Sequence, residues 1–195
     1  MSIPHRHSRV DSPVHIEPLE SRQLFAAGGP VTPPLLTPVP RVKLILQGTS
    51  VKDNIAIDVK KGYLHFFLNG VTKRYNAARV GAIQIHAGNG SDVVRVGNGA
   101  PGVYIDGGGH NDNIAGGLGN DTILGSGGND IINGGMGTDL IDGGKGQDTL
   151  MGGGDRDTLK ANDLELDVVN GGDEFDTAAL DLQDLFDGVE RRQYP

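Results

Sequence analysis

The chain has 195 residues, of which 32 are Gly, more than twice the average usage of about 7%. It has no Cys and no Trp, which excludes disulfide scaffolds, thiolate zinc sites and thiol catalysis. No apolar run approaches the ~18 residues of a membrane-spanning helix, so the sequence predicts no membrane span. The composition therefore favours one modest domain with an unusual Gly-rich segment.

The net charge of −8 is unevenly distributed along the chain. Residues 41–85 carry a net charge of +6, whereas residues 107–160 carry −5 and residues 161–195 carry −8. A basic segment can indicate nucleic-acid binding, but here Lys and Arg alternate with apolar residues and lack interleaved aromatic residues. A solvated strand face is the favoured interpretation, so no nucleic-acid partner is expected.

Residues 1–40 are expected to be a disordered leader and a Pro-rich linker, since they show no hydrophobic period and end in a Pro-dense stretch. Within them, residues 17–26 read EPLESRQLFA, which resembles the LEPR-XLL leader of large exported bacterial proteins. Ser21 departs from that motif, which has Pro at this place.

Residues 41–86 are expected to form β-strands. Apolar residues alternate over 41–46, 55–59, 63–68, 71–75 and 80–86. Asn69-Gly70 stands between two of these segments and predicts a tight β-hairpin turn.

From residue 107 to residue 160 the chain consists of six consecutive units of nine residues, each with Asp at place six and Ile or Leu at place eight. Degraded copies end at Asp92 and Asp176, and the segment from Gly48 to Asp53 has the same outline. His110 and Asp155 stand where the other units have Gly at place four. Glycine permits positive φ, so the first six residues of each unit can form a tight turn.

The pattern G-G-x-G-x-D-x-U-x resembles the RTX-type, or hemolysin-type, calcium-binding nonapeptide repeat. The resemblance implies an all-β fold, a right-handed parallel β-roll over residues 87–179 in which two units make one coil. Stacked turns would place carboxylates near the strand spacing of ~4.8 Å, where they repel each other unless a cation lies between them. Ca²⁺ suits such a site because it accepts 6–8 oxygen ligands of mixed type.

The resemblance yields a set of candidate metal ligands: the six Asp residues at place six, the two Asp residues of the flanking copies, and the turn glycines. They are Asp112, Asp121, Asp130, Asp139, Asp148 and Asp157; Asp92 and Asp176; and Gly107, Gly109, Gly116, Gly117, Gly119, Gly125, Gly127, Gly128, Gly134, Gly135, Gly137, Gly143, Gly144 and Gly146.

If each unit pairs with the next but one, the array holds about four complete calcium sites, with half-sites at its ends. Asp130 and Asp139 then serve two sites each, and the outer Asp residues serve one. Residues 161–170 lack the Gly pattern and are expected to interrupt or close the roll. Residues 180–195 are expected to form a C-terminal cap or tail, as a helix or as a strand.

Two other motifs are set aside. Gly171-Gly-Asp-Glu-Phe matches the diguanylate cyclase signature, but only 19 residues follow Asp176, too few for that enzyme. Residues 97–102 match GxGxxG without the helix that a dinucleotide site needs.

The sequence therefore predicts a non-enzymatic calcium-binding protein, secreted or at the cell surface, in which calcium drives folding and the role is structural or adhesive. The alternative is a non-catalytic targeting or secretion module that works with a separate secreted enzyme. An unknown surface or matrix partner fits either hypothesis.

Overall fold

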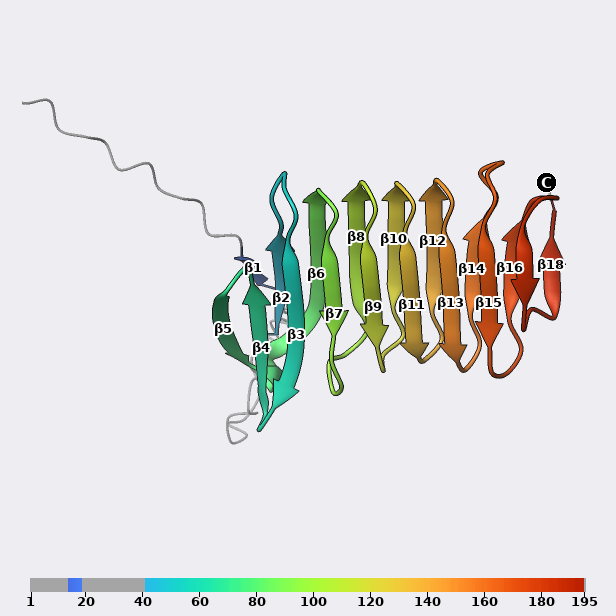
Figure 1. Ribbon diagram of the computed structural model, residues 1–195. Helices are drawn as coiled ribbons and strands as arrows, with labels where there is room; N and C mark the ends of the chain where they lie inside the picture. Colours follow the sequence, from blue (N-terminus) through green and yellow to red (C-terminus); the bar gives the residue numbers. More distant parts are fainter. Residues whose placement is uncertain (1–13, 19–40, 195) are drawn as a thin grey trace, which may run out of the picture.

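The computed structural model describes residues 14–18 and 41–194. The described chain is all-β and forms a parallel β-solenoid, in which the strands alternate between two facing sheets (Figure 1). Within these residues the helical structure is one 3-10 turn, η1 at Ala77–Arg79, and no helix is long or apolar enough to cross a membrane.

The first sheet has nine strands, parallel throughout except for β1, which pairs antiparallel with β2. In spatial order they are β1 (Val14–Pro18), β2 (Val42–Gln47), β6 (Val80–Asn89), β8 (Val103–Gly109), β10 (Thr122–Gly127), β12 (Leu140–Lys145), β14 (Thr158–Ala161), β16 (Thr177–Leu180) and β18 (Arg191–Gln193).

The second sheet also has nine strands, parallel except at the β3–β4 and β4–β5 pairs. In spatial order they are β17 (Leu185–Asp187), β15 (Val168–Gly172), β13 (Thr149–Gly154), β11 (Ile131–Met136), β9 (Asn113–Gly117), β7 (Val93–Val96), β3 (Asn54–Lys60), β4 (Tyr63–Leu68) and β5 (Val71–Asn76).

The register confirms that each nonapeptide pairs with the next but one. Ile123 of β10 lies opposite Ile105 of β8 on one side and Ile141 of β12 on the other, a spacing of 18 residues. Each coil of the solenoid therefore uses two nine-residue units, one for each sheet. This is the parallel β-roll that the resemblance implied.

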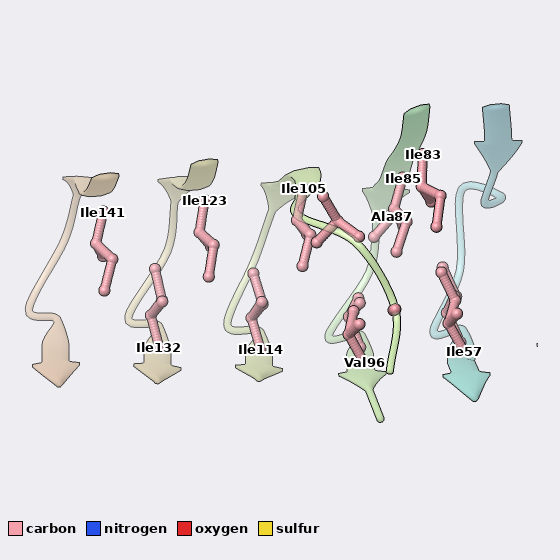
Figure 2. Close-up of a cluster of buried hydrophobic side chains, with 14 of the residues drawn as sticks. Ile57, Ile83, Ile85, Ala87, Val96, Ile105, Ile114, Ile123, Ile132 and Ile141 are labelled. Carbon is pink, nitrogen blue, oxygen red and sulfur yellow. The ribbon is translucent and has the colours of Figure 1, made fainter. Parts of the chain in front are cut away.

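The core is a narrow double row of aliphatic side chains between the two sheets (Figure 2). One row runs through Ile105, Ile123 and Ile141, and the other through Ile114 and Ile132; all five are at most 1% exposed. The residues that flank them in each strand are glycines or point outward. The Gly-rich coils thus bury about one large aliphatic side chain per strand, worth roughly 1.5–3 kcal/mol each.

The N-terminal end of the roll is covered by a β-meander, β3–β4–β5. Asn69 and Gly70 have φ of 48° and 87°, as a type I′ hairpin turn requires, which confirms the predicted hairpin. Phe66 of β4 is 1% exposed and packs edge-on against Tyr75 of β5. The predicted strands of residues 41–86 are all present, and β2, β3 and β6 belong to the same two sheets as the repeats.

Two expectations need correction, and one open alternative is decided. Residues 161–170 neither interrupt nor close the roll, because β15 begins within them, at Val168, and pairs with β13 in register. Beyond Leu180, where a helix and a strand were both open, the chain adds two short strands, β17 and β18. Residues 14–18, expected to be disordered, form β1 on the edge of β2; the rest of the leader, including most of the LEPR-XLL-like segment, lies outside the described residues.

Adjacent residues of β11 test the narrow core. Ile132 is fully buried, whereas Ile131 is 47% exposed on the outer face. We expect Ile132→Ala to lower the free energy of unfolding by about 2–5 kcal/mol and Ile131→Ala by about 0.5 kcal/mol or less. Denaturant unfolding of both variants in one buffer measures this; equal losses would contradict the described facing of β11.

Candidate metal centre

Each tight turn of the roll is formed by backbone conformations that glycine adopts readily. Gly135 and Gly144 at place two have φ of 110° and 96°, and Gly137 and Gly146 at place four have φ of 106° and 121°. His110 and Asp155, the predicted departures from the pattern, adopt the same left-handed region with φ of 77° and 73°. A residue other than Gly in this region carries a backbone strain of roughly 1–2 kcal/mol, so the turn geometry overrides the backbone preference of His and Asp.

The Asp side chains at place six form a ladder along each long side of the roll. Asp112 donates its backbone N–H to Asp130 Oδ1 at 2.8 Å, and Asp130 donates in turn to Asp148 Oδ1 at 2.8 Å. One ladder joins residues 53, 92, 112, 130, 148, 167 and 184. The other joins residues 121, 139, 157 and 176, begins at the N–H of Val103 and ends at Glu190.

The second carboxylate oxygen is different. In seven of these residues Oδ2 is buried and has no hydrogen-bond partner: Asp92, Asp112, Asp121, Asp130, Asp139, Asp157 and Asp176. A buried carboxylate oxygen without a donor or a cation is costly, because it loses its hydration and gains nothing in return. These oxygens therefore mark places where a positive partner is required.

The glycine at place one leaves room beside six of the seven orphaned oxygens; the unit of Asp92 has Ala87 there. A Cβ added to Gly107 would lie 2.6 Å from Asp112 Oδ2 and 3.0 Å from the backbone oxygen of Gly125 in the next coil. The same pair of oxygens, one carboxylate and one carbonyl, surrounds the corresponding position of Gly116, Gly125, Gly134 and Gly152. The space that a side chain would fill is lined by oxygen atoms of two adjacent coils.

This donor set fits Ca²⁺, which takes carboxylate and backbone carbonyl oxygens together in a flexible geometry. Within residues 14–18 and 41–194, no three His, Cys, Asp or Glu side chains converge as a metal cluster. An ion between two coils would therefore draw most of its ligands from the backbone. A zinc ion, which prefers nitrogen and sulfur ligands, would not find them here.

The two ends of the first ladder supply protein donors instead. Asp53 Oδ2 accepts hydrogen bonds from the backbone N–H of Thr49 at 2.5 Å and from its hydroxyl at 3.1 Å, and Asn69 donates to Oδ1. Asp184 Oδ2 accepts from the N–H of Asp181 at 2.7 Å. These two carboxylates are satisfied without an ion, so the orphaned oxygens of this ladder lie between them.

The ladders extend further than the repeat period indicated. Asp167, Asp184 and Glu190 join them, although sequence reasoning did not select these residues, and Asp53 was noted only as an outline. Asp167 stands nine residues before Asp176, a signal that was present in the sequence. Since Asp112 and Asp157 have ladder neighbours on both sides, they are interior positions like Asp130 and Asp139.

Burial raises the pKa of the ladder carboxyls, because desolvation disfavours their charged form. It raises the pKa of Asp112, Asp121, Asp139 and Asp167 to about 7, and that of Asp148 and Asp157 to about 6. Hydrogen bonds from the N–H of the preceding coil oppose this effect, and charge repulsion within the ladders adds to it for Asp112 and Asp139. Without a cation, the folded roll therefore holds protons that the unfolded chain, with carboxyl pKa values near ~3.9, has released.

This difference predicts how the metal-free protein responds to pH. The folded chain binds more protons than the unfolded chain between about pH 4 and pH 7, so its free energy of unfolding rises as the pH falls through that window. The destabilisation is complete above pH 7 and is relieved towards pH 4. Circular dichroism in divalent-free buffer, at about pH 5 and about pH 8, measures it; a metal-free roll that is more stable at the higher pH would contradict this prediction.

Comparison with known families supports the same ion. The chain matches the RTX calcium-binding nonapeptide repeat in four copies, over residues 84–101, 106–141 and 124–159. No curated protein and no solved structure matches it. The chain therefore carries RTX calcium-binding nonapeptide repeats folded as a β-roll, and Ca²⁺ is the ion that these repeats bind.

Proposed function

We propose that the two Asp ladders are two rows of calcium sites whose occupation folds the roll, in an exported or cell-surface protein with a structural or adhesive role. The single observation that carries the proposal is the set of seven buried Oδ2 atoms without a partner. Six of them lie beside a place-one glycine and a carbonyl of the next coil, as at Gly107 and Gly125, whereas the unit of Asp92 has Ala87 at place one.

The proposed ligands are the Asp residues and turn glycines predicted from the repeat pattern, from Asp92 to Asp176. Seven orphaned oxygens support more ions than the four sites that the tight repeats alone suggest. Isothermal titration with Ca²⁺ determines the stoichiometry, for which we expect a value above four.

The calcium affinity expected of such repeats supports export. Extracellular calcium modules have Kd values of about 10⁻⁴–10⁻³ M, and the cytosol would leave such sites empty. A protein whose fold depends on these sites would remain unfolded until it meets millimolar calcium. This supports an extracellular location and a role that begins there.

Ser126, Asp106 and His86 lie together on the outer face, but their order does not support a catalytic role. Ser126 Oγ donates to Asp106 Oδ1 at 3.0 Å, and His86 Nδ1 lies 3.5 Å from Asp106 Oδ2. The carboxylate stands between hydroxyl and imidazole, so His86 does not take the proton of Ser126 as a nucleophile–base pair requires. We therefore favour a non-enzymatic protein, with the roll itself as the functional part.

One prediction of this proposal concerns the part of the chain that calcium folds. Residues 41–86 bury Leu64 and Phe66, and their Asp53 is satisfied by Thr49 and Asn69, so they need no ion. Residues 107–160 have the narrow core and the orphaned oxygens. In hydrogen–deuterium exchange we expect 41–86 to be protected with and without calcium, and 107–160 to be protected only with calcium. Equal protection of both segments in chelator would overturn calcium-driven folding.

A further prediction concerns the space beside the orphaned oxygens. Gly107→Ala places a methyl group against Asp112 Oδ2 and the Gly125 carbonyl, so we expect calcium affinity to fall by about tenfold or more and one site to be lost from the stoichiometry. The matched control is Gly154→Ala, where the new Cβ meets only Met136 Cγ at 3.9 Å. Calorimetric titration of both variants decides; an unchanged Gly107→Ala would place the ion elsewhere.

A further inference from the structure

The two ends of the roll carry opposite charge. Residues 41–85, with a net charge of +6, contribute β3, β4 and β5 at one end, and residues 161–195, with −8, contribute β15 to β18 at the other (Figure 1). Exposed cations at the N-terminal end are Lys60, Lys61, Arg74 and Arg79. At the C-terminal end Asp167, Asp176, Asp181 and Asp184 are buried, and the exposed anions Glu165, Asp173, Glu174, Asp187 and Glu190 outnumber the exposed cations Arg191 and Arg192.

The ends also differ in how the core is closed. At the N-terminal end the meander covers it with Phe66. At the C-terminal end apolar side chains remain in solvent: Leu182 is 94% exposed, Leu164 74%, Leu185 60% and Tyr194 49%. Leu164, Leu182 and Tyr194 line a pocket of about 410 Å³ together with Asp181 and Gln183. Solenoids ordinarily end in a polar capping repeat, and this end is instead apolar with an acidic surround.

Within the described residues both sheets end there in short strands. β17 ends one sheet and β18 the other, and all three residues of β18, Arg191, Arg192 and Gln193, are exposed. At the opposite end of the β17 sheet, β5 is the edge strand. Since β5 is antiparallel to β4 and β4 is antiparallel to β3, β5 runs in the same direction as β3 and hence as β17. A β5 edge brought against β17 would continue the parallel sheet.

From these features we propose that the C-terminal end of one roll docks on the N-terminal end of a second copy of this chain, head to tail. The occupant follows from charge: the acidic apolar end is attracted by the basic meander end and repelled by another acidic end. Such a contact uses two different surfaces, so it leaves a free end on every assembly and permits linear stacks. The docking end includes Asp167 and Asp176, so this inference rests on the proposed calcium-dependent folding.

The test uses the full chain in saturating calcium, with sedimentation velocity over a range of protein concentrations. We expect concentration-dependent association at low salt that weakens in high salt, because exposed charges are screened beyond about 10 Å at 0.1 M ionic strength. Arg74→Glu at the basic end and Leu182→Lys at the acidic end are each expected to raise the dissociation constant by about tenfold or more.

Matched controls on the middle of the roll are Lys145→Glu on β12 and Ile131→Lys on β11, both exposed and separated from each end by further strands, and they are expected to associate as the unmodified chain does. A mixture of Arg74→Glu with Leu182→Lys is the decisive sample. It contains one intact acidic end and one intact basic end, so head-to-tail docking predicts that mixing restores association.

A strictly monomeric chain at all concentrations, or loss of association with Leu182→Lys but not with Arg74→Glu, would overturn the proposal; the second result would indicate contact between like ends. Calcium titration of each variant runs in parallel. Normal calcium binding without association contradicts only the docking, whereas absent calcium binding in the unmodified chain contradicts the proposed function beneath it.

Discussion

The structure depends on Asp carboxylates in which one oxygen accepts a hydrogen bond and the other has no hydrogen-bond donor. In seven turns, one oxygen of an Asp accepts the N–H of the preceding coil, which fixes the stacking register, and the other oxygen is buried without a protein donor. The first contact is worth about 1.5–3 kcal/mol as a charged hydrogen bond, and the second costs a comparable or larger amount. These two contributions nearly cancel. Under the proposed function, a cation that reaches the second oxygen stabilises the folded roll and becomes part of the fold.

Glycine is what makes this arrangement possible and also what makes it marginal. Place-one glycines admit the carboxylate and carbonyl oxygens that a Cβ would displace, and glycines at places two and four supply the left-handed turns. Each glycine also loses more conformational entropy on folding than any other residue and contributes no side chain to the core. The aliphatic rows in Figure 2 recover only part of that loss. Under the proposed function, the coils with most glycine are therefore the ones that depend most on the ion.

The nonapeptide period predicted the β-roll and the pairing of alternate units, because period and register coincide where the units are uniform. It did not predict that Asp167, Asp184 and Glu190 continue the ladders, at spacings of 19, 17 and 14 residues. Ladder positions are set by backbone pairing between strands, and loops of different length between them can deliver a carboxylate to the same place. Asp53 shows the complementary case, in which Thr49 donates to the oxygen that is orphaned elsewhere.

In a stack in which each coil contacts only its neighbours, the two ends are different surfaces, and in this chain they differ in core and in charge. One terminus begins with a thick core and a self-satisfied carboxylate, so order is available there without an ion. Because nearest-neighbour contacts propagate order along a solenoid, this end provides a folded surface on which each ion-loaded coil can form. At the other end, the described residues form strands of three residues with apolar side chains in solvent. The last described coil therefore exposes strand edges and apolar side chains of the kind that each earlier coil buries under the next one. Strand pairing and apolar burial, which add one coil to another within the chain, can act in the same way between this end and a second molecule.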